Sequence, residues 1–383
     1  MQQGEAIVTG GSGFLGARVI DALLRRGWLV RALGRPRGPT PWDARMRRAL
    51  EELEGAPIEG GRLAGLLCYN ADIVSPDLAL APPLPGRAGG AQAVLFHLAG
   101  DTHFRPAAPE RQRRVNVHAG PNLVRTLRGR VDTVVHVSTA YVCGTRRGRV
   151  YEHEADVGQG FHNPYESTKL EGELAMRDVC REQGVPLIVL RPSIILNDSR
   201  TGRSCAATHL NALLEVVGRI QAHFGLGFGE TPSDRVRILA DPRARPNLAP
   251  VDAVVPALLR LALHPGAPGR TYHICHPAPG PMDGFLALLL NALGLSGKLA
   301  LRYVDRLEAP VTYAEKLIVR ALGPYGPYLN SDVRFDLANT RRLIPDYDGL
   351  FPPLATPYLN KVIEFHRVQR ERESRHELLP VCC

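Results

Sequence analysis

Lysine is scarce in this chain of 383 residues: only four of its 47 basic residues are lysines, and the other 43 are arginines. Abundant alanine, glycine and proline accompany the arginines, a composition typical of a GC-rich genome. We therefore attribute most of the formal net charge of +9 to composition rather than to a selected surface for an anionic partner. Because no zinc-finger spacing or RNP-like aromatic pair is present, no nucleic acid is expected as a partner.

Paired cysteines and long apolar runs are also missing. The seven cysteines are odd in number and form no Cys-x-x-Cys pair, which argues against a disulfide framework and against a zinc site. The longest apolar run, from Phe285 to Leu290, is far too short to cross a membrane. Since the chain passes within its first residues into a predicted strand, neither a signal peptide nor an integral membrane segment is expected. These absences favour a soluble protein of the reducing cytoplasm.

The N-terminal half has the pattern of an α/β fold. Residues 6–35 read as a strand, a glycine turn, an amphipathic helix and a second strand. Further short, almost continuously apolar runs are separated by helix-length segments, as in parallel strands that are buried on both faces. These runs span residues 66–69, 93–98, 134–137 and 187–190. We predict a Rossmann-type, doubly wound parallel sheet over residues 1–200. A smaller, mostly helical substrate-binding region should occupy residues 201–383, with about 235–275 returning to the core.

The glycine turn has the composition of a dinucleotide-binding loop. Its residues are Thr9, Gly10, Gly11, Ser12, Gly13, Phe14, Leu15 and Gly16. The glycines at 10, 13 and 16 permit a tight turn, close approach to a pyrophosphate and close packing of helix on strand. The loop follows a predicted strand and opens a helix, which is the context that makes this pattern specific.

The end of the second strand lacks the acidic residue with which NAD-binding proteins usually hold the ribose 2′-hydroxyl. Arg35 and Arg37 stand there instead, and the next carboxylate is Asp43. A guanidinium pairs well with a 2′-phosphate, whereas a carboxylate would repel it, so NADPH is the predicted cofactor. Asp72, after the third strand, either lies near the adenine or caps a turn.

A helix is predicted to begin at Asn163-Pro164, with Tyr165 and Lys169 one turn apart on the same face. A nearby ammonium and a helix N-terminus favour the tyrosine anion, so we expect a lowered phenol pKa. Upstream, a predicted buried strand ends at Ser138-Thr139, which places hydroxyls at the ligand-binding edge of such a sheet.

Taken together, the strand, hydroxyl, loop and Tyr/Lys helix downstream of a dinucleotide loop resemble the extended short-chain dehydrogenase/reductases. The resemblance implies catalytic roles for Thr139, Tyr165 and Lys169, and for Asn116 in "RVNVHAG". Segments such as "HVSTAYVCG", "FHLAGDTHF" and "LRPSIILNDSRTGRS" look like those of the acyl-thioester reductases, which include fatty acyl-CoA reductases and the terminal reductase domains of carboxylic acid reductases and peptide synthetases. Further cofactor contacts are then implied at Ala99, Pro192 and Ser193, the last two beside the nicotinamide.

That resemblance implies reduction of an acyl thioester, on CoA or on an acyl carrier protein, to an aldehyde or onward to an alcohol. Two alternatives stay open. One is a hydroxysteroid or ketone dehydrogenase or a sugar-nucleotide epimerase or dehydratase, and the other is a non-catalytic NADP-binding regulator. Clusters at residues 152–154 and 273–276 are not expected to bind a metal. Cys143 is expected to be a packing residue rather than a nucleophile.

Overall fold

The computed structural model describes residues 4–58, 60–80, 82–86, 92–204, 210–211, 213–216, 218, 235–296 and 300–377. Their contacts divide the chain into two compact units. The first comprises Met1–Ser193, Val254–Cys275 and Arg334–Leu350, and the second comprises Ile194–Ala253, His276–Val333 and Phe351–Cys383. The chain therefore crosses between the units five times.

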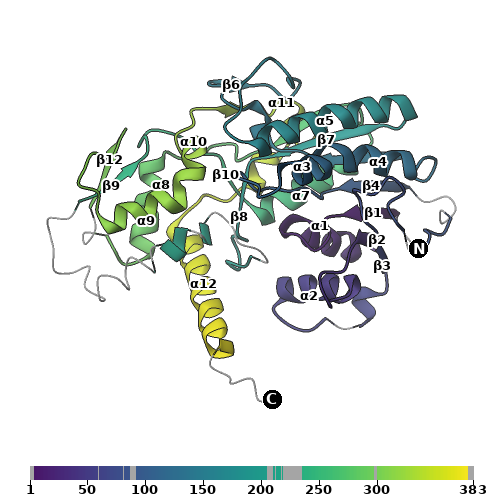
Figure 1. Ribbon diagram of the computed structural model, residues 1–383, viewed down its shortest axis with the longest axis horizontal. Helices are drawn as coiled ribbons and strands as arrows, with labels where there is room; N and C mark the ends of the chain where they lie inside the picture. Colours follow the sequence, from purple (N-terminus) through teal and green to yellow (C-terminus); the bar gives the residue numbers. More distant parts are fainter. Residues whose placement is uncertain are drawn as a thin grey trace. The chain divides into compact units, whose positions relative to one another are not determined.

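The first unit contains a seven-stranded sheet in the order β11-β7-β5-β4-β1-β2-β3 (Figure 1). Its strands are β1 (Glu5–Thr9), β2 (Leu29–Gly34), β3 (Leu66–Asn70), β4 (Ala93–His97), β5 (Thr133–Val137), β7 (Leu187–Pro192) and β11 (Thr271–Ile274). Every neighbouring pair is parallel. Strands β1, β4 and β5 are buried along their whole length, as their apolar runs predicted. The Rossmann-type fold is thus confirmed, and the strand order reverses between β1 and β4, where ligands of such sheets bind.

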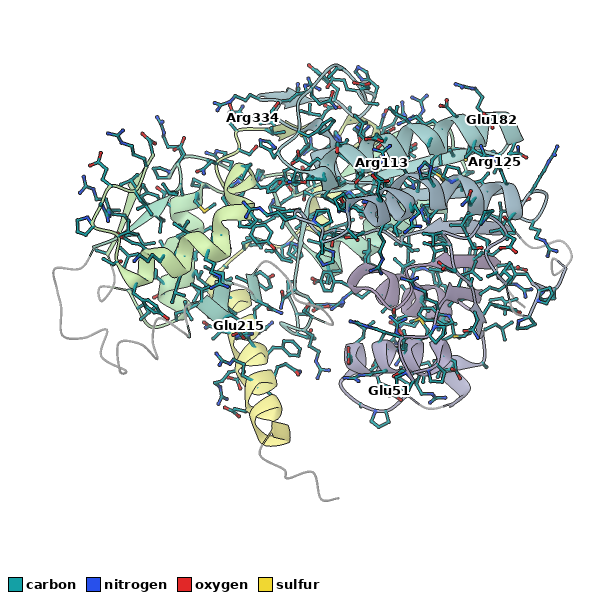
Figure 2. All side chains as sticks on the ribbon, in the orientation of Figure 1. Glu51, Arg113, Arg125, Glu182, Glu215 and Arg334 are labelled. Atoms are coloured by element: carbon teal, nitrogen blue, oxygen red, sulfur yellow. The ribbon has the colours of Figure 1, made fainter. Side chains whose placement is uncertain are left out.

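Helices accompany this sheet in the first unit. They are α1 (Phe14–Arg25), α2 (Trp42–Glu54), α3 (Pro109–Arg113), α4 (Ala119–Thr126), α5 (Pro164–Gln183), α11 (Ala338–Leu343) and most of α7 (Val251–Ala262). A π-helical turn, η2 (Arg114–His118), connects α3 to α4. Figure 1 shows α4 and α5 side by side. Two ion pairs join α5 to its neighbours, one from Arg113 to Glu171 (2.6 Å) and one from Arg125 to Glu182 (3.7 Å), and Figure 2 labels both residues of the second pair. Because both pairs are half-exposed, the packed apolar faces hold these helices more than the charges do.

The second unit combines helices with two small parallel strand pairs. The pairs are β8 (Ile194–Leu196) with β10 (Leu248–Pro250), and β9 (Arg235–Leu239) with β12 (Ala300–Val304). Its helices include α8 (Met282–Ala292), α9 (Tyr313–Leu322), α10 (Gly326–Leu329) and α12 (Thr356–Glu377). Of these described helices, none is long and apolar enough to cross a membrane.

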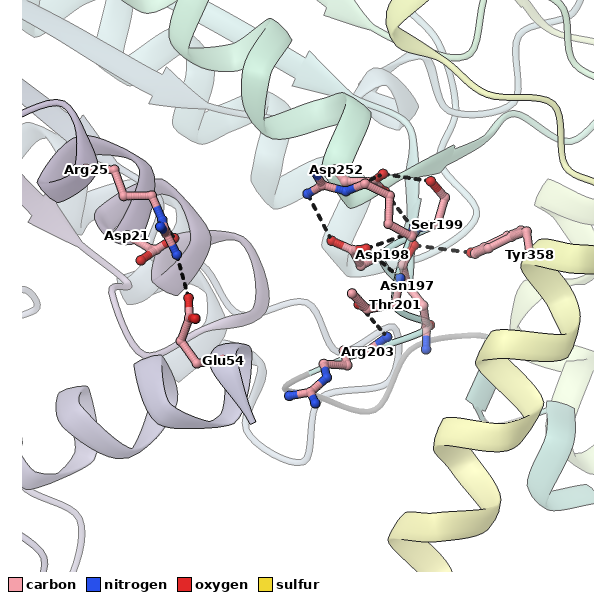
Figure 3. Close-up of polar contacts among 11 residues, drawn as sticks. Asp21, Arg25, Glu54, Asn197, Asp198, Ser199, Thr201, Arg203, Asp252 and Tyr358 are labelled. Atoms are coloured by element: carbon pink, nitrogen blue, oxygen red, sulfur yellow. Dashed lines mark hydrogen bonds and ion pairs between the residues drawn. The ribbon is translucent and has the colours of Figure 1, made fainter. Parts of the chain in front are cut away.

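A polar cluster joins three segments of the second unit (Figure 3). The carboxylate of Asp252 accepts hydrogen bonds from the backbone nitrogen of Ser199 at 2.7 Å and from its hydroxyl at 2.6 Å. The phenol of Tyr358 donates to the carbonyl of Asn197 at 3.2 Å. Ser199 and Asp252, which lie far apart in the sequence, therefore meet within this unit.

Candidate active site

The loop between β1 and α1 is shaped for close approach to a ligand. Gly10 has a left-handed backbone with φ of 73°, and a Cβ on it would lie 2.7 Å from the backbone nitrogen of Ala99. A Cβ on Gly16 would lie 2.1 Å from the carbonyl oxygen of Gly10, so only glycine lets α1 pack this closely on the end of β1. Gly13 is the N-cap of α1 and has no capping side chain, so the positive end of the helix dipole faces the loop.

Thr9 connects this loop to the end of β4. Its hydroxyl oxygen lies 2.8 Å from Nδ1 of His97 and accepts a hydrogen bond from the backbone nitrogen of Ala99 at 3.4 Å. The predicted cofactor residues Thr9 and Ala99 are therefore neighbours at the point where the strand order reverses.

Three arginines gather at the carboxyl end of β2. The guanidinium of Arg45, from α2, donates to the carbonyl of Arg35 at 2.7 Å and to the hydroxyl of Ser12 at 3.1 Å. Burial and the charges of Arg37 and Arg35 lower the pKa of Arg45. Asp72 lies 3.7 Å from Arg35 and also accepts a hydrogen bond from the backbone nitrogen of Val74 in the turn after β3. This corner of the site therefore carries an excess of positive charge beside the glycine loop.

Arg45 was missed by the sequence analysis, although its spacing held a signal. Trp42, Met46 and Ala49 lie on the buried face of α2. Arg45 lies beside this face, three residues after Trp42 and four residues before Ala49. Arg47 and Arg48 are exposed. The helical periodicity of α2 therefore directs Arg45, but not Arg47 or Arg48, toward the glycine loop.

Tyr165 and Lys169 lie one turn apart at the start of α5, where the sequence predicted this helix to begin. The side chain of Asn163 caps the helix by accepting from the backbone nitrogen of Glu166 at 3.2 Å, and Pro164 occupies the first helical position. The ring of Tyr165 is tilted against that of Phe104, with their centroids 5.8 Å apart.

The ionisation of Tyr165 differs from the sequence-based expectation. Burial raises its pKa to about 12, a hydrogen bond with the Thr139 hydroxyl acts in the opposite direction, and the neighbouring Glu166 carboxylate raises it further. The expected lowering of the phenol pKa is therefore wrong, because desolvation outweighs the hydrogen bond with Thr139 that favours the anion. At neutral pH the phenol keeps its proton.

Lys169 is buried and held against the sheet. Its Nζ donates to the carbonyl of Val137, the last residue of β5, at 2.7 Å. Burial lowers the pKa of Lys169 to about 8, and the charge of Glu173, one turn further along α5, raises it. Thr139 follows two residues after Val137 and donates to the carbonyl of Pro192 at 3.5 Å. The predicted residues Thr139, Lys169 and Pro192 are therefore gathered at the carboxyl ends of β5 and β7.

Glu173 is a second residue that the sequence analysis missed. The side chain of Arg191, buried in β7, donates to both of its carboxylate oxygens at 2.9 and 2.7 Å, and Arg177 donates at 2.7 Å. Although burial favours the neutral carboxyl, Arg191 and Arg177 lower the pKa of Glu173 to about 2. The i, i+4 spacing from Lys169 was visible in the sequence, but its partner on β7 was not.

Asn116 lies in the π-helical turn η2 and organises the loop after β4. Its amide oxygen accepts from the backbone nitrogen of Asp101 at 2.8 Å, and its amide nitrogen donates to the carbonyl of Asp101 at 2.9 Å and to the Thr168 hydroxyl at 3.0 Å. A Cβ on Gly172 would lie 2.0 Å from the carbonyl oxygen of Asn116, so α5 approaches this turn closely. π-Helical turns are frequent at functional sites.

Ser193 and Cys143, the other two residues considered from the sequence, are both buried. Ser193 is buried after β7, and its backbone nitrogen donates to the carbonyl of Ile274 at 3.1 Å. Burial raises the pKa of Cys143 to about 12, so its thiol is not a nucleophile at neutral pH. Within the described ranges, no three His, Cys, Asp or Glu side chains are arranged to hold a metal ion.

Comparison with known proteins identifies the family. Residues 8–258, more than half of the chain, match the family described as Male sterility protein. The chain belongs to this family. This result, with the fold, confirms the predicted oxidoreductase of the extended short-chain dehydrogenase/reductase type. It supports NAD(P) as the cofactor, and the preference for NADPH stays a prediction.

Individual relatives of this Male sterility family member are distant in sequence. The nonribosomal peptide synthetase asaC of Aspergillus flavus is 25% identical over 400 residues, which cover 94% of this chain and 36% of asaC. The chain thus spans about a third of the length of this relative.

Solved reductase domains share its fold. The terminal R domain from the myxalamid PKS-NRPS biosynthetic pathway superposes with a TM-score of 0.75 at 21% identity, covering 97% of this chain and 92% of that domain. A thiolation-reductase di-domain from an archaeal nonribosomal peptide synthetase gives a TM-score of 0.71 at 14% identity, covering 97% and 76% of the two chains.

Proposed function

We propose that the chain uses NADPH to reduce an acyl thioester, carried on CoA or on a carrier protein, to an aldehyde and in a second round to an alcohol. The observation that carries this proposal is the gathering of Tyr165, Thr139 and Lys169 at the carboxyl edge of the sheet, downstream of the glycine loop. The names of the similar proteins support the thioester, because they include a thiolation-reductase di-domain.

The described residues fit a phosphorylated dinucleotide. The pyrophosphate would lie against the Gly10–Gly16 loop, where added Cβ atoms would collide with the backbone. Arg35, Arg37 and Arg45 would surround the 2′-phosphate. Burial, and then the charges of Arg37 and Arg35, lower the pKa of Arg45, and a bound anion would offset the charge repulsion. When bound, the reduced nicotinamide supplies hydride to the substrate carbonyl carbon.

Each residue of the site then has a distinct task in this proposal. Tyr165, which is protonated at neutral pH, donates its proton to the oxygen of the attacked carbonyl, and Thr139 orients the phenol by their hydrogen bond. Lys169 holds the ribose, and Asn116 fixes the loop that carries Ala99. The resulting hemithioacetal expels the thiol and leaves the aldehyde.

This proposal is tested by following NADPH consumption against acyl-CoAs, acyl-carrier-protein thioesters, simple ketones and steroids, with product identification by mass spectrometry. We expect turnover with thioesters, one free thiol released per molecule of aldehyde or alcohol formed, and slower reaction with NADH. Turnover of ketones or steroids alone would instead support a ketone dehydrogenase. A lack of turnover with every substrate would support a non-catalytic role.

A further inference from the structure

The loop after β4 carries an aspartate and a histidine that have no task in the proposed reduction so far. Nδ1 of His103 lies 2.6 Å from Oδ1 of Asp101, which also accepts a hydrogen bond from the backbone nitrogen of His103 at 3.1 Å. Although burial favours the neutral carboxyl, the hydrogen bonds from His103 and the charges of His103 and Arg111 lower the pKa of Asp101. An ionised carboxylate can only accept, so Nδ1 carries the ring proton and Nε2 remains for another partner. The side chain of His103 is 78% exposed, so this Asp101–His103 dyad is open to a ligand and to solvent.

Two buried amide side chains hold the backbone of the dyad. Nε2 of Gln112 donates to the carbonyl of His103 at 2.7 Å and to that of Asp101 at 3.3 Å. Asn116 donates to the same carbonyl of Asp101 at 2.9 Å and accepts from its backbone nitrogen at 2.8 Å. Both amide residues are buried. Loops are ordinarily more mobile than the elements they connect, whereas four hydrogen bonds from the interior fix this one.

The loop also lies against the two proposed catalytic residues of α5. At its start, a Cβ on Gly100 would lie 3.9 Å from Nζ of Lys169. At its end, the ring of Phe104 is tilted by 38° against that of Tyr165, with the centroids 5.8 Å apart. The dyad stands between these two contacts, and all of these residues belong to the first unit. The dyad therefore lies beside the position proposed for the substrate carbonyl.

The proposed reduction has a place for a second proton donor. Tyr165 gives its proton to the carbonyl oxygen, but the sulfur departs with an electron pair, and a general acid speeds such a departure. Nζ of Lys169 already donates to the carbonyl of Val137, and the Thr139 hydroxyl donates to that of Pro192. The imidazole of the dyad can give up a proton and regain it from solvent in each turnover.

We infer that His103 is the general acid that protonates the departing sulfur, and that Asp101 orients its ring. This inference rests on the proposed function. As the hemithioacetal collapses, its C–S bond breaks and leaves the electron pair on sulfur, to which Nε2 of the protonated imidazole donates its proton. The hemithioacetal hydroxyl returns its proton to the Tyr165 phenolate as the carbonyl forms, and solvent reprotonates the imidazole. One proton is thus taken from solvent for each thioester reduced to an aldehyde.

Single-turnover kinetics on the whole chain separate hydride transfer from loss of the thiol. The substrate is the alkyl thioester that the chain reduces fastest. NADPH oxidation is followed by absorbance, and released thiol is followed with a fast disulfide reagent after the accessible cysteines of the chain have been blocked. In the unmodified chain, thiol release should keep pace with NADPH oxidation.

His103→Gln should keep the rate of NADPH oxidation within about threefold of the unmodified chain but slow thiol release about 10²-fold, the lower end of the contribution of a general acid. Asp101→Asn should slow thiol release less, because the imidazole stays and only its orientation is loosened. His118→Gln is the matched control, because His118 is an exposed histidine of η2 in the same unit. It should change neither rate.

A change of leaving group distinguishes proton donation from a structural role. The S-phenyl thioester of the same acid releases an aromatic thiol, which is a stronger acid than an alkyl thiol and departs readily as the anion. With this substrate, thiol release in His103→Gln should lie within about threefold of the unmodified chain. Equal defects for the two leaving groups, or thiol release that keeps pace with NADPH oxidation in His103→Gln, would overturn the role of His103 and leave the proposed function standing. If no thioester supports NADPH oxidation in the unmodified chain, the proposed function itself fails and the role of His103 fails with it.

Discussion

Burial shifts the pKa values of Tyr165 and Lys169, which lie one turn apart, in directions that suit a reduction. Burial raises the pKa of Tyr165 to about 12 and lowers the pKa of Lys169 to about 8, so that near pH 7 the pair consists of a neutral phenol and an ammonium. A neutral phenol can donate a proton to a carbonyl oxygen as it receives hydride, whereas a phenolate cannot.

The first prediction concerns that proton. Tyr165→Phe should lower kcat by about 10²- to 10⁴-fold, the usual contribution of a general acid. NADPH affinity, measured by the fluorescence of the bound cofactor, should change little because the phenol is not expected to hold the nucleotide. Full NADPH-dependent turnover in this variant would contradict the role given to Tyr165, whereas loss of binding would indicate a structural effect.

A second prediction concerns cofactor preference. Arg45→Ala should raise the KM for NADPH about tenfold or more and leave the KM for NADH nearly unchanged, because only NADPH carries the 2′-phosphate. Arg48→Ala, on the exposed face of the same helix and paired with Glu52 at 3.0 Å, is the control. Equal effects of Arg45→Ala on the two cofactors would place the 2′-phosphate elsewhere.

At this scale the sequence indicated where the proposed catalytic residues lie, but not how burial shifts their pKa values. Tyr165, Lys169 and Thr139 stand out by spacing within one helix and one strand end. The pKa of Tyr165 depends on desolvation by segments such as the one that carries Phe104, and no local pattern reports that. Arg45 was missed for a related reason, since its role requires α2 to lie beside the glycine loop.

Among the secondary structure elements, α5 carries Tyr165 and Lys169, the proposed reacting residues, and it is fixed on both sides of them. Asn163 caps its start, and the buried Glu173 ties it to Arg191 of β7. Any shift of α5 along the sheet would separate this ion pair, so the pair holds Lys169 in register with the end of β5.

We therefore expect Glu173→Gln to move the alkaline limb of kcat/KM for NADPH to lower pH. This decrease of kcat/KM at alkaline pH should follow the deprotonation of Lys169, whose ammonium loses its proton as pH rises through its pKa of about 8. Because the Glu173 carboxylate raises that pKa, removing its charge lowers it. Glu171→Gln, which removes a half-exposed partner of Arg113 on the same helix, should leave the limb in place.

The free energy of unfolding of the same variant is an independent test of the role of Glu173. Glu173→Gln leaves Arg191 buried without its counter-charge, which should lower the free energy of unfolding in urea by about 3–5 kcal/mol. An unchanged alkaline limb in a folded, destabilised variant would limit Glu173 to a structural role.

The elements of the sheet were predictable because each central strand is a continuous apolar run that needs no partner to be recognised. The short pairs β8–β10 and β9–β12 were not predicted, because β8 and β10 have only three residues each and arginines interrupt the apolar residues of β9 and β12. The pairing of β6 (Arg149–Val150) with β13 (Arg334–Phe335) joins segments far apart in the sequence and leaves no local pattern at either one.

At the scale of the whole molecule, the sheet is completed by late parts of the chain. Strand β11 pairs with β7 over Thr271–Ile274. The buried carboxylate of Glu152 accepts from the backbone nitrogen of His273 at 3.0 Å, and from the hydroxyl of Thr340 at 2.7 Å and its backbone nitrogen at 3.2 Å. The first 193 residues therefore hold the predicted catalytic residues but not all the partners that stabilise them.

The last prediction follows from this arrangement. A truncated chain ending at Ser193 should lack a cooperative thermal transition by circular dichroism and should not bind NADPH, because β7 becomes an open sheet edge and Glu152 loses its partners. The full chain carrying Glu152→Gln should still melt cooperatively, with a Tm several degrees below that of the unmodified chain, since one set of hydrogen bonds is weakened while β11 stays in place. A sharp transition and undiminished NADPH affinity in the truncated chain would show that residues 1–193 fold alone, and β11 would then add nothing to the cofactor site.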